Sequence, residues 1–140
     1  MWVEITGCAF LAVCALFDCR KKQVPLIVII TGILLAFFCR LTGVLENIGW
    51  ERMFLAVLPG ALFLLLAFLT REKVGYGDGW MLIMTGMFAG DRRGVLILLL
   101  SLLMESAAVI VLLALRKIKR EEEIPFAPFL LLGMGVVLWV

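Results

Sequence analysis

Two aspartates stand at the ends of apolar runs in this sequence, where a pair of carboxylates could act on a peptide bond. Asp18 follows the run 2–17, and Asp78 opens the run 78–91. Two carboxylates a few ångströms apart would share one proton, because both cannot be ionised cheaply. The ionised partner can take a proton from water while the protonated partner polarises a carbonyl oxygen. This chemistry needs no metal and no organic cofactor, and we expect neither.

The two aspartates and the glycines beside Asp78 could also have purely structural roles. Asp78 suits a helix N-cap position, whereas an acid at a helix C-terminal end, such as Asp18, opposes the helix dipole. Asp18 is therefore the stronger indication of a functional role, because its position has no structural advantage. Gly75, Gly77 and Gly79 surround Asp78 in "KVGYGDGW" (73–80). Glycine permits both close approach of a peptide and positive φ, although the three glycines would also suit a plain turn between helices.

The composition is that of an integral membrane protein with a single domain, 1–140. Of the 140 residues 64% are hydrophobic, against about 45–50% in soluble domains. A net charge of +2 gives no indication of nucleic-acid binding, and the chain has no histidine. The four cysteines occur without a C-x-x-C pair, so a zinc site is not expected. We interpret Cys8, Cys14, Cys19 and Cys39 as buried, reduced side chains.

Apolar runs separated by charged residues predict an all-α fold, a polytopic membrane bundle of about six transmembrane helices. The runs are 2–17, 24–42, 53–70, 78–91, 94–115 and 125–140. A straight span needs about 20 residues, so the second, third and fifth runs qualify, the first and last are slightly short, and the fourth is clearly short. The fourth is expected to be a thin or tilted helix, or to begin in a wet pocket below the membrane surface. The first run lacks a basic leader and a cleavage site, so it is expected to be a retained span.

The basic residues predict the orientation of these spans. With the N-terminus outside, nine of the thirteen fall on the inner side and four on the outer side, which favours this orientation. The inner residues are Arg20, Lys21, Lys22, Arg71, Lys73, Arg116, Lys117, Lys119 and Arg120; the outer ones are Arg40, Arg52, Arg92 and Arg93. Asp18 and Asp78 then both lie on the cytoplasmic side.

Among the remaining acids, only Glu105 lies in the middle of a predicted span. A carboxyl there is a candidate for function by default. The alternative is a protonated glutamic acid bonded to another helix, with Ser101 or Ser106 nearby. The loop acids Glu46, Glu51, Glu72 and 121–123 are expected to be solvated, and Glu4 and Asp91 lie near span ends. Gly32, Gly60 and Gly86 are candidates for close approach of an incoming helix, although plain packing between the chain's own helices is the expected role of each.

Three segments resemble the type IV prepilin peptidases, a family of membrane-embedded aspartyl proteases. "GYGD" (75–78) matches the family's G-x-G-D motif. "FDCRKKQVP" (17–25) resembles the pattern that follows the family's first catalytic aspartate, and "IPFAPFLLLG" (124–133) resembles its proline–phenylalanine stretch near the C-terminal end. The three segments occur in the family's order.

The resemblance implies an aspartyl endopeptidase whose catalytic pair is Asp18 and Asp78. Such enzymes remove the short basic leader from prepilins or pilin-like proteins at the cytoplasmic face of the prokaryotic inner membrane. The residues expected around the pair are Gly75, Tyr76, Gly77, Gly79, Pro125, Phe126 and Pro128. The 125–129 stretch would cap the pocket or kink the last span; its structural alternative is a helix start with Pro125 in the first turn.

The chain departs from the family at two positions and lacks one segment. Leu26 stands where the family usually has asparagine, and Trp80 stands where it usually has lysine. Nothing corresponds to the paired C-x-x-C segment of members that also methylate the mature pilin, so we expect no methyltransferase activity.

Two other functions remain open on the sequence. In a small transporter or channel subunit, Asp78 and Glu105 would line a polar path beside a broken helix. A catalytically silent relative that assists assembly would tolerate replacement of Asp18 or Asp78. The expected partners of the chain are a pilin-like protein and the lipid bilayer, with the oligomeric state unassigned.

Overall fold

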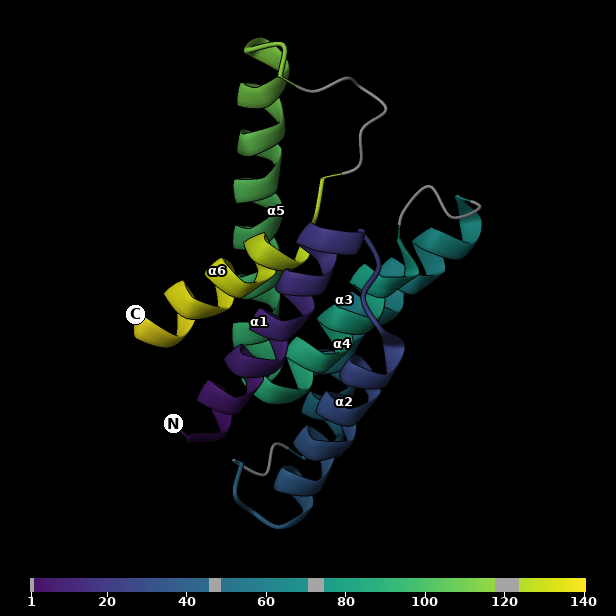
Figure 1. Ribbon diagram of the computed structural model, residues 1–140. Coiled ribbons are helices and arrows are strands. Elements are labelled where there is room, and N and C mark those ends of the chain that lie inside the picture. The colour runs from purple at the N-terminus through teal and green to yellow at the C-terminus, as the bar shows by residue number, and fades with distance from the viewer. Residues whose placement is uncertain (1, 46–48, 71–74, 118–123) are drawn as a thin grey trace.

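Six helices connected by short segments make up the computed structural model of the chain (Figure 1). They are α1 (Trp2–Lys21), α2 (Leu26–Leu41), α3 (Trp50–Leu69), α4 (Tyr76–Ala89), α5 (Asp91–Ala114) and α6 (Ala127–Trp139). The structure describes residues 2–45, 49–70, 75–117 and 124–140. The predicted loop residues Glu46, 71–73 and 119–123 lie outside these ranges. The described part is all-α, which confirms the predicted fold class.

The lengths of the helices correct two expectations from the apolar runs. α1 has 20 residues and is long enough to cross a membrane, as are α3 and α5. α2 was expected to be comfortably long, but it has only 16 residues because Pro25 precedes its first turn. α6 has 13 residues. Long apolar helices of this kind make the chain a membrane protein.

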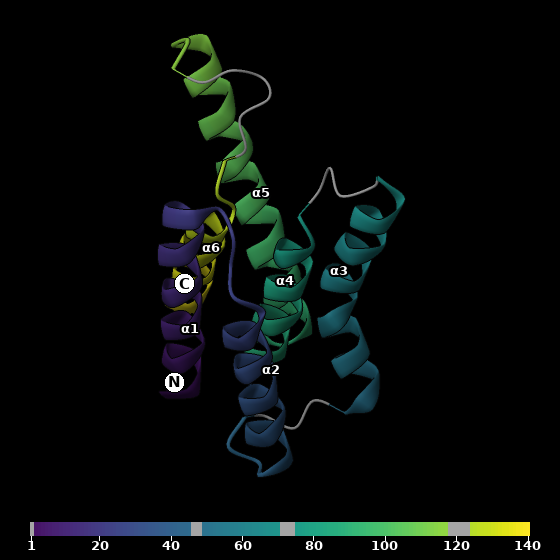
Figure 2. The same ribbon diagram turned by 45° about the vertical axis from the view of Figure 1, so that its right-hand side comes forward.

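The short helix α4 lies in the centre of the bundle and packs against all five other helices (Figure 2). Eight of its 14 residues are buried, including Met81, Met84, Met87 and Phe88. A helix surrounded by protein need not match the thickness of the hydrocarbon core. Its central place explains why α4 can be short and can carry glycine, threonine and aspartate.

Small residues let α3 and α4 approach closely. A Cβ atom on Gly60 would lie 2.7 Å from the Gly79 carbonyl oxygen, and one on Gly86 would overlap the Ala56 carbonyl oxygen. Because helices in lipid associate through close packing rather than through hydrophobic burial, such contacts stabilise the pair. The expected role of Gly60 and Gly86 in packing between the chain's own helices is confirmed. Gly32 likewise packs against Met84, which joins α2 to α4.

Replacement of Gly86 by alanine is expected to lower the free energy of unfolding by about 2 kcal/mol, because the new methyl group meets backbone that cannot rotate away. Gly135→Ala is the matched control, since a Cβ atom there would meet nothing within 4 Å. Unfolding in mixed detergent micelles measures both variants. Equal stability of the two would contradict the packing described here.

Successive helices run in opposite directions, so the C-terminal end of α1 and the N-terminal ends of α4 and α6 lie on one side of the bundle (Figure 1). On the other side, the Arg93 Nη1 atom lies 2.8 Å from Glu4 Oε1. The buried Arg40 side chain donates a 2.8 Å hydrogen bond from Nε to the Met87 carbonyl oxygen at the end of α4. Both contacts tie helices together at the side away from Asp18.

The cysteines are free thiols, but the expectation that all four are buried is wrong for Cys19. That side chain is exposed on the last turn of α1, whereas Cys14 is buried and Cys8 and Cys39 are partly buried. Cys14 and the partly buried Cys8 pack within the apolar core.

Candidate active site

Asp18 is buried at the end of α1, with 8% of its surface exposed. α1 continues through Lys21, so Asp18 lies within the last helical turn rather than beyond it. Its Oδ2 atom accepts a 3.0 Å hydrogen bond from the peptide N–H of Ala127, the first residue of α6. The N-terminus of α6 therefore supplies the positive pole that the C-terminal end of α1 cannot offer to an acid.

Asp78 lies in the first turn of α4 and is partly buried. The N-cap of this helix is Gly75, because the helix begins two residues earlier than expected, at Tyr76. The interpretation of Asp78 as the N-cap residue is therefore wrong. An acid in the first turn is still stabilised by the helix dipole. The Asp78 carboxylate folds back over Gly75, where a Cβ atom would lie 3.3 Å from Asp78 Oδ2.

The three glycines around Asp78 occupy different environments. None of them has positive φ; in the described chain the glycines with positive φ are Gly43 and Gly90. Gly79 is buried against α3, and a Cβ atom there would lie 2.8 Å from the Leu64 side chain. Gly77 faces open space, with nothing within 4 Å of a Cβ position. A plain turn is therefore wrong for Gly77 and Gly79, since both lie inside α4.

The segment 125–129 forms the start of α6. Phe126 is the N-cap residue, Ala127 and Pro128 are the first two helical residues, and Pro125 precedes the helix. The proline of the first turn is therefore Pro128 rather than Pro125. Phe126 is 4% exposed and stacks on Phe63 of α3 with ring centroids 6.3 Å apart. This stacking and the bond to Asp18 fix the entry of the last helix between α1 and α3.

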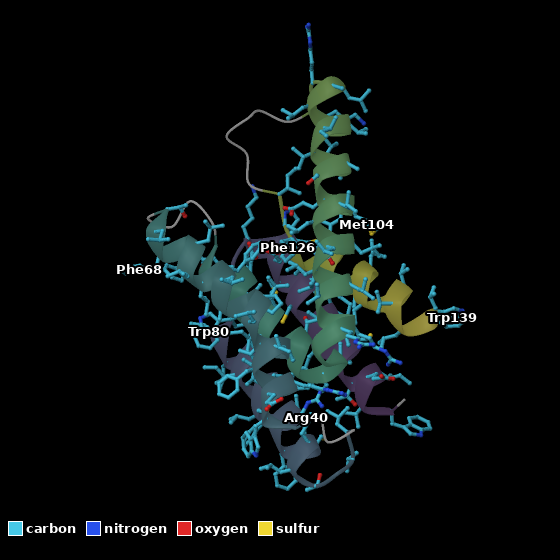
Figure 3. All side chains as sticks on the ribbon, turned by 180° about the vertical axis from the view of Figure 1, so that it is seen from behind. Arg40, Phe68, Trp80, Met104, Phe126 and Trp139 are labelled. Carbon is cyan, nitrogen blue, oxygen red and sulfur yellow. The ribbon has the colours of Figure 1, made fainter. Side chains whose placement is uncertain are left out.

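The tertiary structure brings Asp18 and the 125–129 segment into direct contact, and it places Asp78 at the same end of the bundle. α1, α4 and α6 pack against one another pairwise. The two residues that depart from the family pattern lie elsewhere. Trp80 is 37% exposed and lies at the edge of the bundle, away from Phe126 (Figure 3). Leu26 is 53% exposed at the start of α2.

Glu105 lies on the side of α5 that faces α6. Ile97 lies two turns and Ser101 lies one turn before Glu105 on the same side of α5. Both residues contact the Gly133 position of α6. Figure 3 shows the neighbouring Met104 close to the height of Phe126. Glu105 is partly buried and lies within electrostatic range of Asp18. Ser101 donates its hydroxyl hydrogen to the Ile97 carbonyl oxygen and Ser106 is exposed, so the suggested serine partners are not supported.

No group of three or more acidic or cysteine side chains in the described ranges lies close enough to hold a metal ion. The basic residues nearest to Asp18 in the sequence, Arg20 and Lys21, are exposed. The basic side chains described at this end of the bundle are therefore exposed, while Asp18 is buried and bonds to a peptide group of α6.

One contact of the candidate site, the hydrogen bond from Ala127 to Asp18, was not predicted from the sequence. Alanine carries no chemical group that marks it, and 109 residues separate the pair. The available signal was Pro128, since a proline in a first helical turn marks the place where free N–H groups point outward.

A comparison of the sequence with known proteins places the chain in a family. No curated protein and no solved structure matches the chain. The family profile described as the type IV leader peptidase family matches residues 5–115, which include Asp18, Asp78 and the "GYGD" segment but not the 125–129 segment. This match covers well over half of the chain. The protein therefore belongs to the type IV leader peptidase family.

Proposed function

We propose that the protein is an intramembrane aspartyl endopeptidase that removes the leader of a prepilin or pilin-like protein, with Asp18 and Asp78 as the catalytic pair. One observation carries the proposal: two acids that are at least partly buried stand on packed helices at the same end of the bundle. Buried ionisable groups inside a membrane protein are costly and mark functional sites. Membership of a peptidase family supplies the reaction type.

The reaction is a hydrolysis in which one aspartate starts ionised and the other protonated. The ionised carboxylate removes a proton from water as the water oxygen bonds to the carbonyl carbon, and the protonated carboxyl gives its proton to the carbonyl oxygen. The tetrahedral intermediate then collapses: its hydroxyl proton returns to one aspartate, the other aspartate protonates the amide nitrogen, and the C–N bond breaks. The products are a carboxylic acid and an amine, and the pair again holds one proton.

The cytoplasmic face is proposed as the face on which cleavage occurs. At the end of the bundle that holds Asp18, the described basic residues are Arg20, Lys21, Lys22, Arg116 and Lys117, and all are exposed. Basic residues concentrate on the cytoplasmic side of membrane proteins. A substrate whose cleavage site lies just outside its own membrane helix would meet the pair at this depth.

The open face of Gly77 is the proposed place where the substrate backbone approaches Asp78. Replacement of Gly77 by valine is expected to raise KM about tenfold, since loss of a close contact with the substrate costs roughly 1.4 kcal/mol. The fold should stay intact, because the position is open. Gly135→Val, equally open but on α6, is the control. Steady-state cleavage kinetics and thermal unfolding measure the two effects. A Gly77→Val chain with native KM would place the substrate elsewhere.

The test of the function is cleavage by the purified chain in liposomes. A pilin-like protein from the same genome serves as substrate, and mass spectrometry reads the new N-terminus. We expect one cut before the substrate's apolar helix and an unmethylated product. Ion or solute flux through the same liposomes without cleavage would favour the channel alternative instead.

A further inference from the structure

The start of α6 holds one of the proposed catalytic aspartates through its backbone. The Ala127 N–H donates to Asp18 Oδ2 at 3.0 Å, and both residues are buried. The hydrogen-bond donor is a peptide group in the first turn of a helix, where N–H groups have no partner within the helix. We propose that the Ala127 peptide N–H is a positioning group of the active site: it fixes the Asp18 carboxylate through Oδ2 and leaves Oδ1 to exchange a proton with water. The inference rests on the proposed function.

The residues on either side of Ala127 restrict the motion of its N–H group. Phe126 caps α6 and stacks on Phe63 of α3, while its carbonyl oxygen accepts the N–H groups of Phe129 and Leu130. Pro128 has no N–H and a restricted φ, so the first turn has few alternative conformations. Ala127 itself has no exposed surface. A peptide group fixed in this way holds the carboxylate without the freedom of a side-chain donor.

The position of Asp18 on α1 also explains why its carboxylate needs a hydrogen-bond donor from another helix. Asp18 is on the last turn of its own helix, where unpaired carbonyl groups repel a carboxylate. Glu105, a second acid within electrostatic range, adds to this repulsion when ionised. Without the bond from α6, the side chain would be free to turn toward the exposed residues that end α1. Proton transfer requires a group held within hydrogen-bond reach of its target.

Backbone substitution tests the contact directly. Lactic acid in place of Ala127, introduced by nonsense suppression, removes this N–H and keeps the methyl group. The ester also weakens the Phe126 carbonyl as an acceptor, so the control is the corresponding ester at Leu131 in the interior of the same helix. The Leu131 ester weakens the Leu130 carbonyl in the same way and removes the Leu131 N–H, but it leaves the Asp18 contact in place.

We expect kcat of the Ala127 ester to fall about 10- to 100-fold relative to the Leu131 ester, which is the loss of a hydrogen bond to a charged group. KM should agree within about twofold for the two esters, since the bond acts on the catalytic group and not on the substrate. Equal kcat for both esters, with native cleavage intact, would overturn the inference and leave the proposed function standing.

A thermal unfolding cycle separates failure of the inference from failure of the function. It combines the Ala127 ester with Asp18→Ala. If the bond exists, the two changes lower Tm by less together than the sum of their separate effects. Additive shifts would overturn the inference. If the native chain cleaves no pilin-like substrate but the shifts are non-additive, the proposed function fails and the bond is structural only.

Discussion

Asparagine in place of either Asp18 or Asp78 is expected to lower the cleavage rate by about a thousandfold or more, with folding preserved. Asparagine has nearly the shape of aspartate, but it neither takes nor gives the proton that the reaction moves. In Asp18→Asn the new amide keeps an oxygen that can accept the Ala127 N–H, so α6 stays anchored. At position 78 the loss of a charge from the first turn of α4 costs only about 0.5 kcal/mol of stability.

Glu51→Gln is the matched control for these two variants. Glu51 is an exposed acid in the first turn of α3, so the substitution removes one first-turn charge as Asp78→Asn does, at the opposite end of the bundle. Cleavage of the same pilin-like substrate, followed by mass spectrometry, compares the three chains with the native one. A near-native rate for either aspartate variant would contradict the pair, and Glu105 would then be the next acid to replace.

Removal of the Arg40 side chain is expected to produce the second large effect, a loss of about 3 kcal/mol in the free energy of unfolding. Arg40 is 7% exposed on the last turn of α2, and its Nε donates to the Met87 carbonyl oxygen at the C-terminal end of α4. A cation there also complements the helix dipole. Gly90 ends α4 in the left-handed region, at φ 88°, and the Arg40 guanidinium lies beside it. Arg40→Ala therefore frees the end of the central helix.

Arg52→Ala provides the comparison, because Arg52 is exposed on α3 at the same side of the bundle. Its loss should change stability by less than about 0.5 kcal/mol. Unfolding in mixed detergent micelles measures both, and Arg40→Lys tests geometry, since lysine keeps the charge but lacks the Nε donor. Equal stability of Arg40→Ala and Arg52→Ala would show that Arg40 does not anchor α4.

The length of α4 was predicted from the sequence, but the reason for it was not. The run 78–91 is short for a span, and the expected reasons were a thin helix or a wet pocket. The structure gives another reason: α4 packs against the five other helices and eight of its 14 residues are buried, so most of this helix is covered by protein. Hydropathy along the chain reports how apolar a segment is, but not which helices cover it. The central position therefore could not be read from the run itself.

At the candidate site, the contacts of the predicted residues could not be read from the sequence. Asp18 was recognised as an acid in an unfavourable place on its helix, and the structure supplies the compensating group, the N-terminus of α6. Gly77 and Gly79 look alike in the sequence, yet one faces open space and the other packs on Leu64. The pairing of Asp18 with Asp78 stays a prediction, which the asparagine variants test.

The sequence by itself determined the all-α membrane class and the succession of apolar helices that the described residues form. These follow from local properties, since the length of an apolar run sets a span and each span reverses the direction of the chain. Only the tertiary structure decided that α4 is central, that Gly79 is a packing residue, and that Ala127 holds Asp18. Those results depend on contacts between helices far apart in the chain, and packing in lipid selects them by shape rather than by hydrophobicity.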